Sequence, residues 1–579
     1  MAKVQGQAND SQAVIETVII VGAGIAGLAA ALDLLKLEGE ASKSASLPFQ
    51  QRPRRLRVVL LEARSRVGGR IHTQPFSDGS GDSVDLGASF VHGTHDNPLT
   101  ELAGVVPYSL YLPPEASSSR YLSQHTPGKT LEAAAAEKLD FVTFSAVFAR
   151  LRELAQSHPR LVFDQGVSMQ DALLSQDVDI ISALWGGWQD DKASVAAAKA
   201  IMPVWAGWTG APLSDVALRW WGFEREYEGE DAIVKEGYGP TLVEWHRRQV
   251  IALGGELLLD TEVIGIADGT DGEPLQLSHH APASTLTFSS YSGIEIMARH
   301  RKTGEQHSFK ADRAVCTLPL GVLKHHTGLQ SGTAPALFNP PLPARRLEAI
   351  RRLGSGLLDK AVLRYDSAWW RDLEQTDQER NPQTILCPPS VQIGTDGSLE
   401  FDFDAAAQSS TAGLSALEEL KREALFIYDY DVVKSEPTLV AFIAPPLAES
   451  LESASDDDIG RVLHERLVAS FAGAKVESEP PRPQEILVTR WRQDPFSRGS
   501  YSFLPAAKPS SSSSADAEAR AGSTPLDLDE LARPLWQGRL GFAGEHCHAD
   551  CYASVHGALL TGRREAARIW SEIRRQTSQ

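Results

Sequence analysis

A short apolar segment near the N-terminus carries the clearest pattern of buried and polar positions in the chain. Residues 17–21 form an apolar, β-branched run that is typical of a buried strand. A turn with Gly22, Gly24 and Gly27 follows, and the apolar residues 28–31 then predict the start of a buried helix. The order of strand, glycine turn and helix is that of a dinucleotide-binding motif.

The turn and the strand that follows it favour a bound dinucleotide for physical reasons. Glycines let the backbone approach a phosphate closely, and the N-terminal amides of the next helix stabilise the anion. A second predicted strand, residues 56–61, ends in Glu62, whose carboxylate is placed to accept hydrogen bonds from a ribose. Arg64 and Arg70 follow Glu62 in a Glu-x-Arg…Gly-Gly-Arg extension, which is typical of FAD proteins rather than NAD dehydrogenases.

The strand and helix patterns predict an α/β composite fold with two interleaved domains. Patterns of a Rossmann-like FAD-binding domain recur in three separate pieces of the chain. The stretches between them, one rich in helix-forming Ala and Leu and one of mixed character, predict a substrate domain of mixed sheet and helices. The predicted FAD-binding domain comprises residues 14–100, 238–335 and 480–579, and the predicted substrate-binding domain comprises residues 101–237 and 336–479.

Length and bulk composition agree with this division. A chain of 579 residues exceeds what one hydrophobic core usually holds, so two domains are expected. No apolar run approaches the roughly 20 residues that cross a bilayer. The polar N-terminus and the lack of a C-terminal Ser-Lys-Leu predict a cytoplasmic protein without a signal peptide, with the nucleus as an alternative. The serine-rich residues 506–530 are predicted to be a flexible surface insertion.

Charge and cysteine content limit the choice of partners. The formal net charge of −19 argues against nucleic acid as a main partner. It favours cationic small molecules if carboxylates line an entrance, while a generally acidic surface is the alternative. Four cysteines do not suggest a disulfide framework. Cys547 and Cys551 stand beside histidines, but their spacing is not a strong metal signature, so we predict no metal site.

Taken in order, the motifs resemble those of the flavin-containing amine oxidase family, and polyamine (spermine and acetylpolyamine) oxidases match best within it. The resemblance runs from residue 17 to residue 568. Ser500 stands where monoamine oxidases carry the cysteine that bonds to the flavin, which implies that FAD is bound non-covalently. The motifs that carry the resemblance are residues 21–28, 62–70, 85–99, 316–324 with Lys360, and 491–503 with 541–562.

The resemblance implies a set of residues around FAD. In the family, the residue matching Glu545 bonds a ribityl hydroxyl, and the backbone of the residue matching Val263 faces the adenine. The implied cofactor-binding residues are Gly22, Gly24, Gly27, Glu62, Arg64, Arg70, Gly87, Ala88, Ser89, Val263, Trp491, Glu545 and Val555.

The resemblance also implies four catalytic or substrate-side residues. Lys360 matches the lysine that holds a water against flavin N5, and its alternative is a surface lysine on a strand. Tyr501 matches one wall of an aromatic cage, and Ser554 stands where plant polyamine oxidases and monoamine oxidases have the second tyrosine wall. His92 matches the active-site histidine of animal polyamine oxidases, and its alternative is a histidine that fills a loop.

An acidic stretch is expected to line the substrate tunnel. Glu224, Glu226 and Glu228 are two residues apart, so in an extended segment they share one face. A carboxylate there would anchor the distal ammonium of a polyamine. Glu226 is the central candidate, and the pattern leaves open which of the three points inward. A solvated acidic edge is the alternative.

The activity implied by the resemblance is oxidation of a polyamine. Hydride would pass from the carbon next to a secondary amine of spermine, spermidine or an acetylated polyamine to flavin N5. Hydrolysis of the imine would give an aldehyde and an amine, and O2 would be reduced to H2O2. The expected partners are therefore a small cationic polyamine and O2, with no nucleic acid and no membrane.

Three other functions were weighed against this one. A histone lysine demethylase agrees with residues 491–502 and Ser554, but only about 16 residues precede the first strand and no long charged helical hairpin is seen. An L-amino-acid oxidase would need an arginine clamp for a carboxylate, which we could not place. A non-catalytic flavin-binding protein is disfavoured because both Lys360 and Tyr501 are present.

Overall fold

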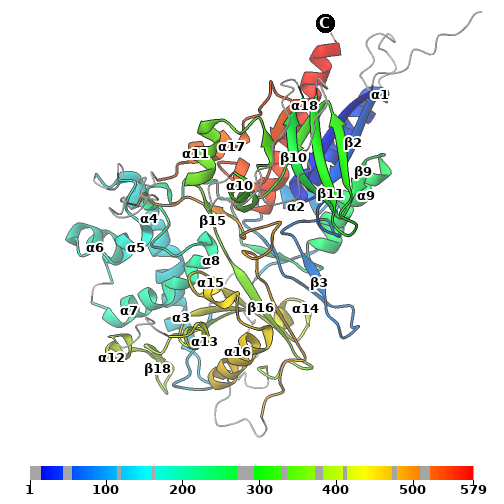
Figure 1. The fold of residues 1–579 in the computed structure, drawn as a ribbon. Helices are drawn as coiled ribbons and strands as arrows, with labels where there is room; N and C mark the ends of the chain where they lie inside the picture. The colour runs from blue at the N-terminus through cyan, green and yellow to red at the C-terminus, as the bar shows by residue number, and fades with distance from the viewer. Residues whose placement is uncertain are drawn as a thin grey trace, which may run out of the picture.

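The computed structural model shows an α/β composite in which a parallel sheet and a mostly antiparallel sheet form the centres of two adjoining regions (Figure 1). This arrangement confirms the predicted fold class. None of the described helices is long and apolar enough to cross a membrane. The structure describes residues 15–43, 55–113, 119–159, 161, 164–188, 190–269, 293–327, 336–371, 382–407, 414–471, 479–508 and 522–577.

The centre of the cofactor-side region is a five-stranded sheet in which every pairing is parallel. Parallel sheets are buried on both faces, and the β-branched, apolar first strand fits such a position. Strands from all three pieces predicted for the cofactor domain pair in this one sheet. Their spatial order is β24 (Leu540–Phe542), β13 (Arg313–Cys316), β1 (Ile15–Val21), β2 (Arg55–Leu61) and β9 (Glu256–Leu258).

Helices cover one face of the parallel sheet. Side chains alternate along β1, so Val18 and Ile20 pack against the helical layer while Ile19 and Val21 pack on the opposite face. Two helices from opposite ends of the chain, blue and red in Figure 1, pack against each other in this layer. The helices of this layer are α1 (Ile25–Lys43), α9 (Glu244–Ala252) and α18 (Val555–Thr577).

A four-stranded sheet and three short helices cover the opposite face. Their apolar side chains form one core with the outward-facing residues of β1 and β2. The strands are β12 (Gln306–Ala311), β11 (Ile294–His300), β10 (Thr261–Asp268) and β14 (Phe338–Asn339), and the helices are α10 (Leu320–His326), α11 (Ala344–Arg352) and α17 (Pro525–Ala532).

The second region is built on a six-stranded sheet. All its pairings are antiparallel except the one between β17 and β7. Helix α16 (Asp456–Phe471) packs on one face through a core of leucines and tryptophans. The strands are β22 (Glu485–Val488), β16 (Asp359–Arg364), β21 (Thr438–Ile443), β20 (Leu425–Asp429), β17 (Gln383–Leu386) and β7 (Arg120–Leu122).

A cluster of helices flanks the six-stranded sheet and shares a separate apolar core with it. This cluster corresponds to the stretch rich in Ala and Leu, and it contains a π-helical segment, Phe141–Ala146, between two α-helices. The α-helices are α3 (Ala133–Asp140), α4 (Val147–Ser157), α5 (Met169–Leu173), α6 (Val178–Trp185), α7 (Lys192–Ile201) and α8 (Ala206–Thr209).

Two strands pair across the predicted domain boundaries. Strand β22 lies in the piece 480–579, yet it pairs with β16 in the six-stranded sheet. Strand β14 lies in the piece 336–479, yet it pairs with β10 on the cofactor side. Both strands are short, so their apolar patterns carry no signal for the sheet that they join.

The predicted flexible insertion, residues 506–530, is wrong at both of its ends. Ala506 is buried, and α17 begins within the predicted insertion. A capping box between Thr524 and Asp527 starts this helix, and Leu528 and Leu531 bury its apolar side. The centre of the serine-rich stretch, residues 509–521, lies outside the described residues.

Candidate active site

A single large cavity connects the two regions. Its volume of about 2110 Å³ exceeds the roughly 300–1,000 Å³ that is usual for a ligand pocket. One end lies at the carboxyl ends of β1 and β2, and the other end reaches the six-stranded sheet. In a doubly wound sheet this carboxyl edge is where a dinucleotide binds. The cavity therefore has room for a dinucleotide and a substrate together.

Two positions in the glycine turn at the start of the cavity require glycine. Gly22 has a φ of +100°, which side chains other than glycine rarely adopt. A Cβ on Gly27 would lie 2.1 Å from the carbonyl oxygen of Gly22. Gly24 lines the cavity, and the nearest protein atom to its Cβ position is 3.9 Å away. The turn thus presents bare backbone to the cavity, as a phosphate cradle requires.

Glu62 lies at the carboxyl end of β2 and lines the same end of the cavity. Its carboxylate accepts hydrogen bonds from the amides of Ala23 and Arg64, both at 2.8 Å, and the residue is 4% exposed. An ionised carboxylate has about four acceptor sites. Two of them are taken by these amides, so the others are available to ribose hydroxyls.

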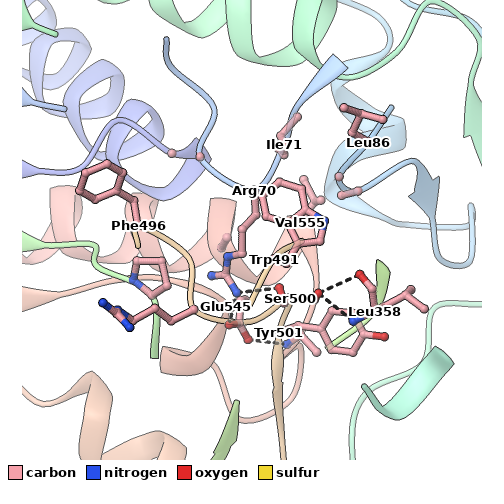
Figure 2. A pocket seen from close by; sticks show the side chains of 18 of the residues that line it. Arg70, Ile71, Leu86, Leu358, Trp491, Phe496, Ser500, Tyr501, Glu545 and Val555 are labelled. Atoms are coloured by element: carbon pink, nitrogen blue, oxygen red, sulfur yellow. Dashed lines mark hydrogen bonds and ion pairs between the residues drawn. The ribbon is translucent and has the colours of Figure 1, made fainter. Parts of the chain in front are cut away.

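Arg64 and Arg70 tie the nucleotide end to the segment around residue 500. The guanidinium of Arg64 donates to the carboxylate of Asp494 at 2.7 Å. Arg70 donates to the carbonyl of Ser500 and to Glu545, both at 2.9 Å, as Figure 2 shows. These bonds hold the cavity wall in place independently of any ligand.

Glu545 is the buried centre of this network. Its carboxylate accepts from Arg70, from the Ser502 hydroxyl at 2.6 Å and from the amide of Ala553 at 3.0 Å. Burial raises the pKa of Glu545, but Arg70, His546 and the Ser502 hydroxyl outweigh this and hold the pKa below its usual range. Glu545 is therefore an anion that lines the cavity and fixes two of its walls.

Twelve of the thirteen cofactor-binding residues predicted from the sequence line the cavity. Gly27 alone lies beneath it, packed on Gly22. Gly87 is another position of close approach, because a Cβ there would lie 1.8 Å from the carbonyl oxygen of Arg70. A glycine cradle, a ribose-facing carboxylate and a basic and aromatic wall fit FAD. Ala88, Ser89, Val263, Trp491 and Val555 complete the predicted set along the wall.

Lys360, on β16, reaches across from the six-stranded sheet into the middle of the cavity. Its ammonium donates to the carbonyls of Asp85 at 2.8 Å and Gly87 at 2.7 Å, and to the Ser89 hydroxyl at 2.9 Å. The residue is 4% exposed. Burial lowers its pKa to about 8, although the charge of Asp85 opposes this shift. Lys360 is therefore a buried, hydrogen-bonded cation in the cavity wall, and it links β16 to residues 85–89.

Tyr501 and Ser554 line the cavity but are also fixed by the fold. The Tyr501 hydroxyl bonds the carbonyl of Gly207, and burial raises its pKa well above the usual range. Ser554 donates to the carbonyl of Cys551 at 2.7 Å and accepts from the amide of Gly557 at 3.0 Å, so it caps the start of α18. Its hydroxyl is thus engaged by the helix rather than free in the cavity.

The structure pairs His92 with a residue that the sequence analysis missed. Nδ1 of His92 lies 2.8 Å from a carboxylate oxygen of Asp231, and both residues line the cavity. The pairing of β5 (Phe90–Val91) with β8 (Ala232–Val234) brings them together. The only sequence signal for Asp231 was its place at the end of the acidic stretch, directly before a β-branched run.

The predicted tunnel carboxylates lie elsewhere. Glu226 forms an ion pair with Arg152, its side chain is 65% exposed, and it is not among the described residues that line the cavity. Neither Glu224 nor Glu228 lines it. The prediction for Glu226 therefore does not agree with its position, because the segment bends away at Gly222 and Gly229, both with positive φ.

Other carboxylates occupy the substrate end. Glu419 and Glu423 line the cavity beside helix α13 (Ala416–Leu420). Burial raises the pKa of Glu423, and the charge of Arg466 only partly opposes this shift. The sequence around Glu419 and Glu423 is that of an ordinary exposed amphipathic helix, so it did not indicate that these carboxylates line a cavity.

Aromatic rings line the wall between these carboxylates and His92. Phe442 lies 5.4 Å from Phe426 and 6.1 Å from Phe90, between ring centroids, and Phe90 lies 5.5 Å from Tyr428. Trp208 continues the row at 6.4 Å from Phe426 and is 46% exposed. Aromatic faces attract cations and methylated amines. Phe426 and Tyr428 are two residues apart on β20, so both rings lie on the same face of the sheet.

All four cysteines are free and buried. Within the part of the chain that the structure describes, no group of His, Cys, Asp and Glu side chains could hold a metal ion.

Comparisons with known proteins show which proteins the chain is similar to. The chain is 28% identical over 575 residues to "Lysine-specific histone demethylase 1 homolog 1" of Arabidopsis thaliana, covering 97% of this chain and 53% of that protein. It is 27% identical over 560 residues to "Protein FLOWERING LOCUS D" of the same plant, covering 96% and 55%. The chain thus spans about half the length of these relatives.

A solved structure shares the fold. Wild-type putrescine oxidase bound to putrescine superposes with a TM-score of 0.59 at 18% identity, covering 96% of this chain and 99% of that one. The family model for flavin containing amine oxidoreductase matches residues 25–570. The chain therefore belongs to the flavin-containing amine oxidoreductases, an enzyme family whose cofactor is FAD.

Proposed function

We propose that the protein is an FAD-dependent amine oxidase that oxidises a secondary amine of a polyamine, with O2 as the electron acceptor. The observation that supports this most is the continuous cavity. It joins a glycine-built nucleotide cradle to a chamber lined by aromatic rings and carboxylates, with the buried ammonium of Lys360 between them. Such a chamber suits an extended cationic substrate, since its walls can meet several separated ammonium groups.

The chain's own residues would hold, orient and desolvate the reactants. FAD, when bound, accepts a hydride from the carbon next to the amine and passes the electrons to O2. Lys360 supplies a fixed positive charge at the junction, in a site that excludes water. Tyr501 offers a rigid ring face to the neutral amine, and the aromatic row would guide the chain of the substrate. Hydrolysis of the imine would then yield an aldehyde and a shorter amine.

The carboxylates of the cavity would select for positive charge. Glu419 and Glu423 lie on the substrate-side wall, apart from the nucleotide cradle, and would meet a distal ammonium of the polyamine. His92 lies by β5, where its ring would face the reacting amine. Acetylation of one end of a polyamine removes a positive charge, so the preference between free and acetylated forms would depend on these carboxylates.

A second substrate class is an N-methylated lysine in a peptide. The name of the relative "Lysine-specific histone demethylase 1 homolog 1" favours it. Oxidation of one methyl carbon and hydrolysis would release one formaldehyde and leave a lysine with one methyl group fewer. This substrate would also favour a nuclear location over the cytoplasm.

Peroxide release by the purified yellow protein tests both proposals. The panel contains spermine, spermidine, their N1-acetyl forms, a dimethyl-lysine histone peptide, benzylamine and L-amino acids, with products identified by mass. Turnover of a polyamine, with an aldehyde and a shorter amine as products, is expected. Peroxide and formaldehyde only with the peptide would replace the polyamine proposal by the demethylase one.

A further inference from the structure

We propose that Asp231 is a positioning residue that holds His92 as the proton acceptor for the substrate amine, so that the two form a His–Asp dyad beside the reacting centre. This inference rests on the proposed amine oxidation. It assigns a role to Asp231, whose acidic neighbours 224–228 were the ones predicted to face the substrate.

The backbone around the dyad is fixed from both sides. Strands β5 and β8 pair with Val91 opposite Ala232, which places the two side chains next to each other at the strand ends. One carboxylate oxygen of Asp231 lies 2.8 Å from Nδ1 of His92, and the other accepts from the amide of Gly93 at 2.9 Å. The side-chain amide of Asn97 donates hydrogen bonds to the backbone carbonyls of His92 and Gly93. The strand pairing and these hydrogen bonds therefore hold His92 and Asp231 in contact.

This geometry selects one form of the imidazole. An ionised carboxylate only accepts hydrogen bonds, so Nδ1 of His92 must carry the proton of this bond. In the neutral ring the lone pair is then on Nε2. The His92 side chain is 52% exposed and lines the cavity, which leaves the ring open to a bound amine. A neutral His92 in this form can accept a proton from a substrate ammonium.

The charges around the dyad support the same assignment. The position of His92 inside the cavity, partly shielded from bulk solvent, lowers its pKa, but the charge and hydrogen bond of Asp231 outweigh this and raise the pKa above its usual value. Burial raises the pKa of Asp231, but His92 and the amide of Gly93 outweigh this and lower it. Among the described residues, His556, Tyr238 and Tyr428 interact electrostatically with the pair, and Arg225 and Tyr227 lie close to His556.

Among those groups, His556 is the nearest possible competitor for the proton. Burial, together with the charge of His92, lowers its pKa to about 3, so it is neutral at working pH. Burial raises the pKa values of Tyr238 and Tyr428 above their usual range, and these hydroxyls keep their protons. The titration of the dyad near neutral pH therefore belongs to His92.

The dyad predicts a sign for the pH dependence. Below the pKa of His92, the protonated ring has no lone pair and cancels the negative charge of Asp231, so kcat/KM for a cationic amine falls. Asp231→Asn removes the charge but keeps an acceptor oxygen for Nδ1. The pKa of His92 then falls by about 1 to 3 pH units, as for other groups that lose a close counter-charge. The acidic limb of kcat/KM moves to lower pH by a similar amount.

Two measurements test the dyad. The first is the NMR titration of histidine Cε1–H signals in the protein labelled at histidine, without substrate, with the His92 signal assigned from His92→Gln. The second is the pH profile of kcat/KM for the best amine. Asp231→Ala, which loses both charge and acceptor, is expected to lower kcat at every pH. Glu230→Gln is the matched control, because it neutralises the adjacent, exposed carboxylate and should move neither the titration nor the limb.

The outcomes separate this inference from the proposed function. A lower His92 pKa and a displaced acidic limb in Asp231→Asn support the dyad. An unchanged His92 titration overturns it, as does an equal loss of activity at all pH values in both Asp231 variants. If no amine on the panel is oxidised, the proposed function fails. The NMR result then shows only whether Asp231 controls the ring, and an unchanged limb with any later substrate still overturns the inference.

Discussion

The two ends of the cavity are built in different ways. The nucleotide end uses backbone atoms and a few side chains from short contiguous motifs, such as the turn at residues 22–27 and the segment 62–70. The substrate end uses side chains from β5, β8, β16, β20, β21 and the turn after α13, which are far apart in the sequence. The nucleotide end is thus specified by spacing along the chain, and the substrate end by packing between sheets.

This difference has a consequence for substitutions. At the nucleotide end, a single extra atom meets backbone, which cannot move without breaking strand pairing. At the substrate end, a changed side chain faces open cavity and alters charge or shape without disturbing the core. We therefore expect substitutions at the first end to remove the cofactor, and those at the second end to change rates and substrate preference.

The largest expected effect is at the glycine turn. In Gly27→Ala the new methyl group would lie 2.1 Å from the carbonyl of Gly22, so the turn must shift. We expect purified protein without visible flavin absorbance, and a stability loss of about 1–3 kcal/mol from overpacking. Gly39→Ala is the matched control, because nothing lies within 4 Å of its Cβ. There alanine should keep FAD and stabilise α1 by about 0.5–1 kcal/mol. A yellow Gly27→Ala protein would contradict the cradle.

Removal of the buried ammonium comes next. In Lys360→Met we expect FAD to stay bound and kcat to fall about 100- to 1,000-fold, as when a fixed electrostatic group is lost. Lys360 is protonated below about pH 8 and neutral above it, so the wild type should lose activity as pH rises through about 8. The variant should lack this alkaline limb in its steady-state pH profile.

A second lysine provides the control for this experiment. Lys434 bonds the carbonyl of Ser83 and is also mostly buried, but it is not among the described residues that line the cavity. Lys434→Met should lower Tm and leave kcat close to the wild type. Equal losses of kcat in both variants would mean that Lys360 acts through stability alone.

A smaller effect is expected at Ser554, where the two ends meet on α18. Because its hydroxyl caps the helix, Ser554→Ala should cost about 1 kcal/mol of stability and change kcat little. Thermal unfolding and steady-state kinetics measure both quantities. Ser554→Thr keeps a capping hydroxyl and should restore the Tm. A large fall in kcat with an unchanged Tm would instead make Ser554 part of the substrate cage.

The smallest effect is expected from the acidic stretch. Glu226→Gln breaks a mainly exposed ion pair with Arg152, so the stability loss should stay below about 1 kcal/mol and KM for a polyamine should not change. Glu423→Gln removes a carboxylate that lines the cavity, and it should raise KM several-fold. A raised KM in Glu226→Gln alone would show that the segment moves to the substrate when one binds.

The sequence was sufficient for most of the nucleotide end. Gly22, Glu62 and Arg70 stand in short motifs after predicted strands, and all three line the cavity. The strands of residues 17–21 and 56–61 extend by only one or two residues beyond their predicted starts. Motifs of this kind depend on the local conformation of the backbone, which is set by residues that are neighbours in the sequence.

The substrate end was only partly predictable. Lys360 and His92 were found by resemblance, but the acidic stretch gave Glu226 where the structure offers Asp231. Gly222 and Gly229 have positive φ in that segment, and a pattern of polar and apolar residues does not predict the direction in which the chain turns there. Phe426 and Tyr428 lie on β20 and line the cavity, and the sequence analysis assigned no role to either.

What the sequence alone determined is therefore the fold class, the cofactor motif and the residue types of the nucleotide end, because each depends on contacts between near neighbours in the chain. The tertiary structure decided which carboxylates and rings line the cavity, and that Asp231 contacts His92. Those contacts join strands more than a hundred residues apart, and their geometry is set by how two sheets pack, which no short stretch of sequence contains.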